Sequence, residues 1–213
     1  MQTQGKISVR PAEPSDVPLL ARIDQLATEP PTGRSFWDDV LAPIETPTLD
    51  FLEAMFRERA ATWGAIEDFI VVETDGQPVA GCAVYRSDPD NPAYDPFDLN
   101  RLPLGWSDHQ AEAFRVGYAK VWADVGDFLA PQAEWIVEAV AVLPEHQRQG
   151  HGRRLIEAAI AKARDAGGES LGVMVIHGND PAAGLYEEFF NPWITYHAAY
   201  FGDGFPGLTK YRL

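Results

Sequence analysis

The fold is decided by the sequence Trp135-Ile-Val-Glu-Ala-Val-Ala-Val-Leu143, followed by Pro144-Glu-His-Gln-Arg-Gln-Gly-His-Gly-Arg-Arg-Leu155. The first part is apolar on both faces except at Glu138, which indicates a strand buried within a sheet. A turn starts at Pro144. Residues 153–166 then place apolar side chains on one helical face, and two glycines end the pattern. A buried strand, a glycine-containing loop and an amphipathic helix in this order predict part of an α/β fold.

The rest of the chain adds elements on both sides of this unit. Residues 7–10 alternate like a strand, and Ser15 or Asp16 is placed to cap a helix that ends near Ala27. Asp75-Gly76 separates two β-rich runs, 69–73 and 79–85, and predicts a hairpin. Further helices are expected at 49–63, from 107 onward and at 181–190, and further strands at 171–176, 195–201 and 208–213. We therefore expect one domain, residues 1–213, with a mixed β-sheet flanked by helices.

Composition limits the class of protein. The chain has 213 residues, of which 46% are hydrophobic, and it contains no apolar run of the length that a bilayer span needs. Its first residues lack the basic and apolar runs of a signal peptide, so a cytoplasmic location is expected. Cys82 is the only cysteine and lies in an apolar run, so we interpret it as a core residue without chemistry.

Charge is distributed unevenly along the chain. The formal net charge is -15, which argues against a nucleic acid or an anionic membrane surface as partner. Residues 1–133 carry 22 acidic and 10 basic side chains, whereas residues 134–213 carry 10 and 7. Residues 146–154 hold three arginines, two histidines and no acid, so an anion could bind there. The acidic remainder suits a cationic substrate, although solubility alone also explains it.

The loop from Gln147 to Gly152 carries the main candidate binding site. A glycine-containing loop that opens a helix presents unpaired backbone N–H groups at the positive end of the helix dipole, and these suit a phosphate or pyrophosphate. Other phosphate loops fit poorly, because Arg153-Arg154 follows where a P-loop needs Lys-Ser/Thr, and Leu155 stands where the dinucleotide fingerprint has its third glycine. Two glycines alone favour the alternative, an ordinary strand-to-helix turn in which glycine serves the backbone geometry.

Two motifs resemble those of the GNAT superfamily of N-acetyltransferases. Residues 144–155 are similar to its acyl-CoA-binding motif, Gln/Arg-x-x-Gly-x-Gly/Ala between a strand and a helix, with matches at Gln147, Gly150 and Gly152. Residues 179–190 resemble its segment Asn-x-x-Ala-x-x-Leu-Tyr-x-x-x-Gly-Phe, except that Phe189 stands where glycine is usual. The order of elements fits this family over nearly the whole chain.

The resemblance implies a fold and a set of cofactor contacts. The sheet of this family is splayed at the strand before the loop, and acetyl-CoA (coenzyme A) is the co-substrate. The strand backbone at Val140, Ala141 and Val142 would pair with the pantetheine arm, and an N–H near Val142 would polarise the thioester carbonyl. Asn179 would contact the pantetheine region. The pyrophosphate would bind the loop residues Gln147, Arg148, Gln149, Gly150, His151, Gly152 and Arg153. The histidines lack metal-ligand spacing with acids, so no metal is expected.

Transfer to an amine requires two proton handlers, because an alkylamine arrives protonated and the departing thiolate needs a proton. The resemblance places the acid at Tyr186, for which a core aromatic is the alternative. For the base, Glu138 is the best candidate, since it is the one acid in an apolar strand and burial raises its pKa; a salt-bridged glutamate is the alternative. His177 is the second candidate base, with a structural role as the alternative.

The acceptor site of this family forms from segments that correspond here to residues 30–63 and 86–131. These contain many acids and the aromatics Phe36, Trp37, Trp63, Tyr94, Phe97 and Trp106. Such a composition suits a cationic amine with an apolar body, carried by a small molecule or a protein. The expected function is acetyl transfer from acetyl-CoA to a primary amine by direct attack. A non-catalytic acyl-CoA-binding regulatory module, a longer acyl donor, and assembly as a monomer or a homodimer stay open.

Overall fold

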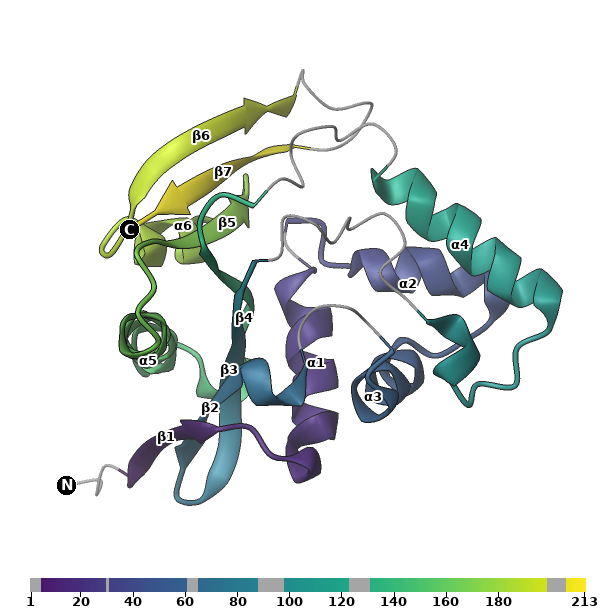
Figure 1. Cartoon of the computed structure of the whole chain (residues 1–213), viewed down its shortest axis with the longest axis horizontal. Coiled ribbons are helices and arrows are strands. Elements are labelled where there is room, and N and C mark those ends of the chain that lie inside the picture. Colours follow the sequence, from purple (N-terminus) through teal and green to yellow (C-terminus); the bar gives the residue numbers. More distant parts are fainter. Residues whose placement is uncertain (1–4, 30, 61–64, 88–97, 123–130, 199–205) are drawn as a thin grey trace.

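A computed structural model describes residues 5–29, 31–60, 65–87, 98–122, 131–198 and 206–213. The described strands form one seven-stranded sheet in the order β1-β2-β3-β4-β5-β7-β6 (Figure 1). Among the described strands, only β4 and β5 are parallel neighbours, so the sheet is mixed, as expected. The strands are β1 Ile7–Pro11, β2 Phe69–Thr74, β3 Gln77–Arg86, β4 Trp135–Val142, β5 Leu171–Ile176, β6 Asn191–His197 and β7 Gly207–Arg212.

Helices cover both faces of this sheet, and each face has its own hydrophobic core (Figure 1). The α1-side core contains residues such as Leu20, Phe51 and Phe114, and the α5-side core contains residues such as Leu155 and Val173. The helices on the α1 side are α1 Val17–Ala27, α2 Phe36–Leu41, α3 Thr48–Glu58 and α4 Asp108–Trp122. Those on the α5 side are α5 His151–Asp165 and α6 Asp180–Tyr186.

The start of α1 differs from the expected side-chain cap. Asp16 is the N-cap residue, but its carboxylate does not bond the first turn of α1. It instead accepts hydrogen bonds from Arg10, which makes two, and from the backbone N–H of Glu13. Arg10 also donates to Glu73 on β2 at 2.6 Å. The carboxylate therefore joins the first strand to the turn before α1, because a buried acid needs a charged partner.

Helix α2 is a second difference, because we expected no helix between Ala27 and residue 49. Ser35 begins α2: its hydroxyl accepts from the N–H of Trp37 at 3.1 Å, and Asp38 accepts from the N–H of Ser35 at 3.2 Å. This capping box is present in the sequence as Ser-x-x-Asp, but the surrounding Pro, Thr and Asp residues are typical of a loop, so no helix was expected there. Helix α6 ends at Tyr186, four residues before the expected end, and β6 begins at Asn191 rather than at Thr195.

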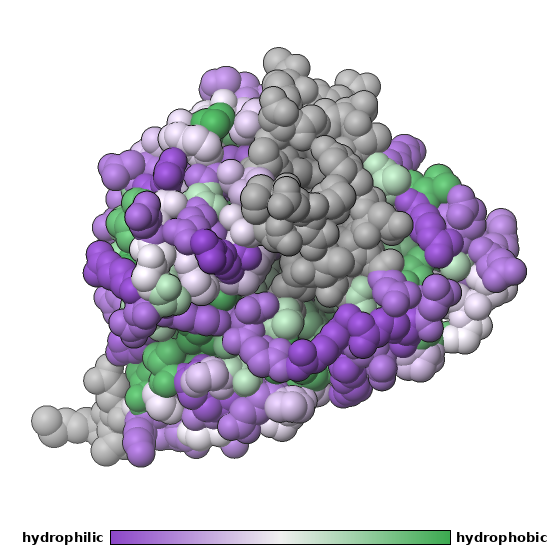
Figure 2. Space-filling model, in the orientation of Figure 1, coloured by the Kyte–Doolittle hydropathy of each residue, from purple (hydrophilic) through white to green (hydrophobic). Residues whose placement is uncertain are grey.

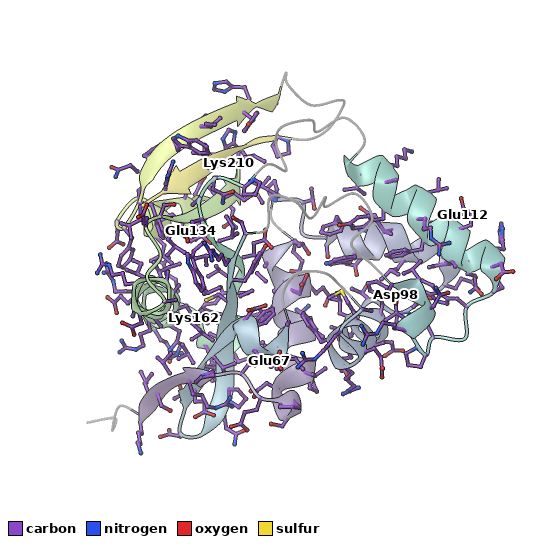
Figure 3. The ribbon with its side chains drawn as sticks, viewed as in Figure 1. Glu67, Asp98, Glu112, Glu134, Lys162 and Lys210 are labelled. Carbon is purple, nitrogen blue, oxygen red and sulfur yellow. The ribbon has the colours of Figure 1, made fainter. Side chains whose placement is uncertain are left out.

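A lysine side chain of α5 forms hydrogen bonds with the turn that precedes β2. Lys162 donates to the carbonyl of Glu67 at 3.2 Å and to that of Asp68 at 2.8 Å, and Figure 3 labels it on α5. The described surface seen in Figure 2 is mainly hydrophilic, in keeping with the net charge of -15. Within the described part of the chain, no helix is both long and apolar enough to span a membrane.

Candidate functional site

A β-bulge interrupts β4 where the strand reaches the site. Glu138 pairs with Ala83 and Ala141 pairs with Gly81, so Ala139 and Val140 together face the single residue Cys82. Ala139 has a φ of 49°, which is uncommon for a residue with a Cβ and marks a bulge of this kind. The bulge turns the strand beyond Glu138 away from its earlier course.

The sheet is splayed at this bulge, as the family resemblance implied. Strand β4 pairs with β5 only from Trp135 to Val137, and β5 then continues to Ile176 paired with β7 alone. Over the described strands, the β5-facing backbone edge of β4 from Glu138 to Val142 therefore has no strand partner. Val140, Ala141 and Val142 are half-buried, whereas we expected a strand buried on both faces. The physical reason for the difference is this opening, and its free N–H and C=O groups can accept an extended amide-containing ligand.

The loop after β4 presents backbone N–H groups at the start of α5. Arg148 has a φ of 62° and Gly150 a φ of 82°, so the chain turns sharply twice before the helix begins. Gly150 is the N-cap residue of α5, and no side chain caps the first turn. The first N–H groups of a helix lack intrahelical partners, and they lie at the positive end of its dipole. This geometry fits a pyrophosphate.

The two glycines of the loop have different structural roles. A Cβ on Gly150 would meet no atom within 4 Å. Glycine is therefore favoured here by the left-handed backbone conformation, and the open space at this position leaves room for an anion. A Cβ on Gly152 would lie 3.1 Å from Leu185 Cδ2 on α6. Gly152 therefore lets α5 and α6 approach closely, which the sequence alone did not indicate.

Two basic side chains at the start of α5 have buried nitrogens without partners. His151 is 1% exposed, and both of its ring nitrogens lack hydrogen bonds among the described residues. Arg154 Nε is likewise buried and without a hydrogen-bond partner among the described residues. Burial lowers the pKa of His151, and the neighbouring His146 and Arg154 lower it further. A pyrophosphate at this helix end would be attracted by the positive end of the helix dipole, without a charge on His151.

Helix α6 packs beside this loop and carries the second motif. Asn179 caps it, because its side-chain oxygen accepts from the N–H of Ala182 at 3.4 Å. Arg153 on α5 forms an ion pair with Glu188 and lies 5.0 Å from the centroid of the Phe189 ring. The phenylalanine that replaces the usual glycine thus becomes a packing surface for the first turn of α5.

Tyr186 is the last residue of α6 and is 4% exposed. Its ring contacts those of Phe190 and Tyr211 edge to face, at centroid distances of 6.4 and 6.1 Å. Burial raises the pKa of its hydroxyl well above the ordinary value, so the group keeps its proton at neutral pH. Burial also raises the pKa of Cys82 to about 12, which keeps this thiol protonated and a poor nucleophile.

Glu138 faces the α1 side of β4, opposite to Tyr186. Glu138 is half-buried, and this burial raises the pKa of its carboxyl group. The Tyr85 hydroxyl donates a hydrogen bond to its carboxylate, which partly offsets that rise in pKa. A carboxyl group with a raised pKa can take a proton near neutral pH. The bulge thus stands between a candidate base on one face of the sheet and a candidate acid on the other.

A sequence model described as the Acetyltransferase (GNAT) family matches residues 34–191. This chain belongs to the GNAT acetyltransferase family. Similar solved structures include an N-acetyltransferase from Staphylococcus aureus Mu50, with a TM-score of 0.68, 13% identity and 97% of this chain and 100% of that chain covered. A putative acetyltransferase from Salmonella typhimurium, solved with its cofactor acetyl-CoA, has a TM-score of 0.53, 16% identity and coverages of 97% and 92%. A ribosomal-protein-alanine N-acetyltransferase from Brucella melitensis has a TM-score of 0.55, 18% identity and coverages of 97% and 98%.

The family model shows the family, and the likenesses to solved structures confirm the mixed α/β fold. No curated protein sequence is significantly similar to the chain. Membership of the GNAT family identifies the protein as an acyl-CoA-dependent acetyltransferase, and an acetyl-CoA co-substrate agrees with the loop geometry. In the described residues, no group of three or more His, Cys, Asp or Glu side chains is placed to hold a metal ion.

His177, the second candidate base of this GNAT protein, lies at the end of β5 in a hydrogen-bonded position. Its Nε2 is 3.0 Å from the hydroxyl of Thr209 on β7, which is also 3.2 Å from that of Thr195 on β6. The imidazole therefore ties three neighbouring strands together. This partner set favours the structural alternative for His177.

The aromatic side chains expected at the acceptor site mostly belong to the α1-side core. Trp37 is 1% exposed and stacks near Phe51 and Tyr118, at 5.5 and 6.0 Å between ring centroids. Trp106 is half-buried and lies parallel to Phe51, 5.8 Å away. Trp63, Tyr94 and Phe97 lie outside the described residues, as does most of the acidic segment 88–98.

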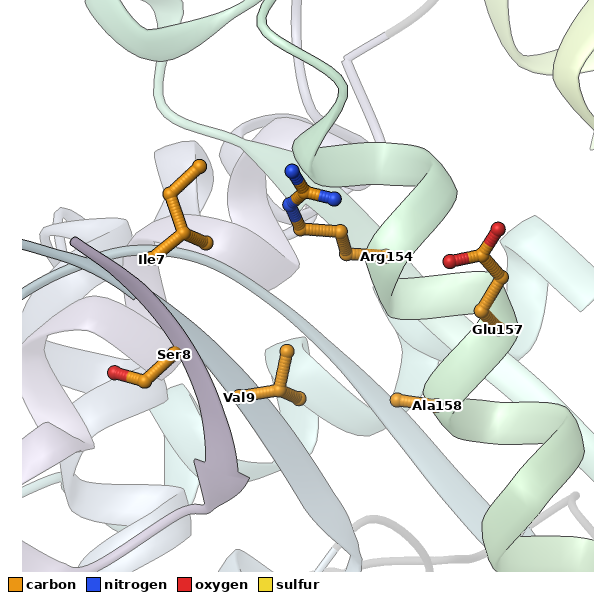
Figure 4. Close-up of a pocket in the computed structure, with 6 residues that line it drawn as sticks. All are labelled: Ile7, Ser8, Val9, Arg154, Glu157 and Ala158. Atoms are coloured by element: carbon orange, nitrogen blue, oxygen red, sulfur yellow. The ribbon is translucent and has the colours of Figure 1, made fainter. Parts of the chain in front are cut away.

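Two of the cavities in the GNAT fold lie away from Glu138 and Tyr186. One, of about 380 Å³, lies between β1 and α5 and is lined by Ile7, Ser8, Val9, Arg154, Glu157 and Ala158 (Figure 4). The other, of about 570 Å³, lies between α4 and the turn before it and includes Trp106 and Arg115. Neither contains Glu138 or Tyr186, so the chemistry is placed by the splay and the loop rather than by these cavities.

Sequence reasoning missed Asp24 and Tyr85. Asp24 lies on α1, and its Oδ1 accepts a hydrogen bond from Trp37 Nε1 at 2.8 Å. Tyr85 lies on β3, two residues after the partner of Glu138, and therefore on the same face of the sheet. No local motif marks either residue, because each becomes a neighbour of Glu138 only through the packing of α1 and β3 on β4.

Proposed function

We propose that this protein is an N-acetyltransferase that transfers the acetyl group of acetyl-CoA to a primary amine of a small molecule or a protein by direct attack. The observation that carries the proposal is the combination of a bulged, splayed β4 with an anion-binding loop, placed between Glu138 and Tyr186. Each part supplies one requirement of the reaction, namely donor binding, removal of a proton and delivery of a proton.

Donor binding is assigned to backbone groups. The N–H groups from Gln147 to Arg153 hold the pyrophosphate, and the free edge at Val140, Ala141 and Val142 pairs with the pantetheine arm. Asn179 contacts the pantetheine region from the start of α6. Acetyl-CoA supplies an activated acetyl group as a thioester, and an N–H near Val142 polarises its carbonyl as in an oxyanion hole.

Proton handling is assigned to two buried groups. Glu138 removes a proton from the ammonium form of the acceptor, which its raised pKa favours. Tyr186 donates a proton to the sulfur of the departing thiolate, and its own raised pKa keeps this proton in place until then. The acidic residues 1–133 favour an acceptor that carries positive charge.

The test is release of free thiol from acetyl-CoA in the presence of a panel of primary amines. We expect at least one amine to accelerate thiol release above the rate of hydrolysis, and its acetylated product to be detected by mass spectrometry. The Gly150→Val variant serves as the control without a cofactor site. Tight binding of acetyl-CoA with no turnover on any amine or protein terminus would favour the non-catalytic regulatory module instead.

A further inference from the structure

The cavity between β1 and α5 lies apart from the proposed donor site (Figure 4). Its volume of about 380 Å³ falls within the usual range of small-molecule sites, roughly 300–1,000 Å³. Among the described strands, β1 pairs with β2 alone, so the cavity lies at one edge of the sheet. The splay that the donor is proposed to enter lies between β4 and β5, and β2 and β3 separate it from β1. The cavity is therefore placed for a ligand other than acetyl-CoA.

The two consecutive arginines of α5 lie on different flanks of this helix. Arg153 forms an ion pair with Glu188 and lies beside the ring of Phe189, next to α6. The following residue, Arg154, is rotated by about 100° around the helix axis. Its side chain lines the cavity together with Ile7 of β1 (Figure 4). An anion bound by Arg154 would therefore lie on the flank of α5 that faces β1.

The charge of Arg154 is not neutralised by any residue that the structure describes. The side chain is half-buried, and in the described part of the chain its guanidinium forms no ion pair and no hydrogen bond. Glu157, one turn further along α5, pairs with Arg153 instead, at 3.8 Å. His151, one turn earlier, is 1% exposed, and its ring nitrogens also lack partners among the described residues. Buried donors without acceptors cost free energy, so this flank of α5 favours binding of an external acceptor.

The lining of the cavity indicates what kind of acceptor fits. A guanidinium presents its donors in a planar fork, which matches the two oxygens of a carboxylate. Ile7, Val9 and Ala158 supply apolar surface next to it. Glu157 lines the same cavity, and its negative charge opposes a ligand that carries several negative charges. A single carboxylate on an aliphatic body satisfies all three conditions, whereas a phosphate or a coenzyme A molecule does not.

We propose that the cavity between β1 and α5 is a second binding site, which takes a small monocarboxylate with an aliphatic body and holds its carboxylate on Arg154. The site goes beyond the proposed transfer reaction, because none of the residues that line it belongs to the groups assigned to donor binding or proton transfer. Its ligand can therefore be bound at the same time as acetyl-CoA.

The first experiment locates the ligand. Backbone amide NMR signals would be followed while 4-methylpentanoate is added to the protein saturated with coenzyme A. We expect saturable shifts at residues 7–9 and 154–158, and at least about tenfold weaker binding of the neutral 4-methylpentanamide and of inorganic phosphate. Shifts confined to the loop 147–152, displacement of the carboxylate by coenzyme A, or equal binding of the acid and its amide would overturn the proposal.

The second experiment compares variants of α5 by the same titration, with thermal unfolding as the check of folding. Arg154→Leu should weaken the binding of 4-methylpentanoate by about tenfold or more, because a charge-assisted hydrogen bond is lost. Arg164→Leu is the matched control, since it removes an exposed arginine from the last turn of the same helix. Equal binding by these two variants would overturn the proposal.

A third variant tests the cavity without changing its charge. Ala158→Phe places a ring where the aliphatic body of the ligand is expected, so it should abolish binding while Arg154 is kept. It also keeps the proposal testable if Arg154→Leu does not fold. Unchanged binding of 4-methylpentanoate to a folded Ala158→Phe protein would place the ligand elsewhere and overturn the proposal.

Discussion

Replacement of Tyr186 by phenylalanine removes one oxygen atom from a ring that is 4% exposed and packed between Phe190 and Tyr211. The ring and its edge-to-face contacts stay, so the variant should fold and bind acetyl-CoA nearly as the wild type does. If the hydroxyl protonates the departing thiolate, kcat should fall by roughly 100- to 10,000-fold, the usual contribution of a general acid. This corresponds to about 2.7 to 5.5 kcal/mol in the activation barrier.

The assay is steady-state thiol release at saturating amine, together with thermal unfolding and the KM for acetyl-CoA. Tyr211→Phe is a matched control, because Tyr211 is in ring contact with Tyr186 and loses only a 3.4 Å hydrogen bond to Glu187. We expect Tyr186→Phe to lower kcat with little change in KM, and Tyr211→Phe to change neither. A Tyr186→Phe variant with full turnover per folded molecule would refute the reasoning and make Tyr186 a core aromatic.

Three further predictions follow from the loop and from charge. Coenzyme A should raise the Tm of the wild type, because it binds only the folded state, and Gly150→Val should abolish that shift by blocking the anion and straining a φ of 82°. Thermal unfolding with and without millimolar coenzyme A measures both effects. A Tm shift that is retained in a folded Gly150→Val variant would place the pyrophosphate site elsewhere. The pKa of His151 is lowered in the folded protein, so the unfolded chain binds a proton at higher pH than the folded chain does, and the free energy of unfolding should decrease as pH falls below about 6.5. Urea unfolding at several pH values should show this decrease, and His151→Leu should reduce it. An identical pH dependence in the variant would contradict a buried neutral imidazole at this position. The KM of the acceptor should rise with ionic strength, because salt screens its attraction to the acidic residues 1–133; a KM independent of salt would show that the charge serves solubility.

The sequence by itself determined the features that depend on neighbouring residues. The hairpin from β2 to β3 follows from Asp75-Gly76, and the helix after Gly150 follows from a local turn and a one-sided apolar pattern. The proposed anion-binding loop is also local, because its N–H groups come from consecutive residues. For the same reason, the two motifs at residues 144–155 and 179–190, taken together, indicated the family.

The tertiary structure decided which side chains meet at the site. The bulge at Ala139 arises from pairing two residues of β4 against one of β3, and the splay arises because β4 pairs with β5 only as far as Val137 and Val173. Neither leaves a pattern along the chain. Asp24 and Glu138 are far apart in sequence, and they interact only because α1 packs on β4. Local patterns record the contacts of each residue with its chain neighbours, whereas the charge, burial and partners of these two acids are set by contacts between distant elements.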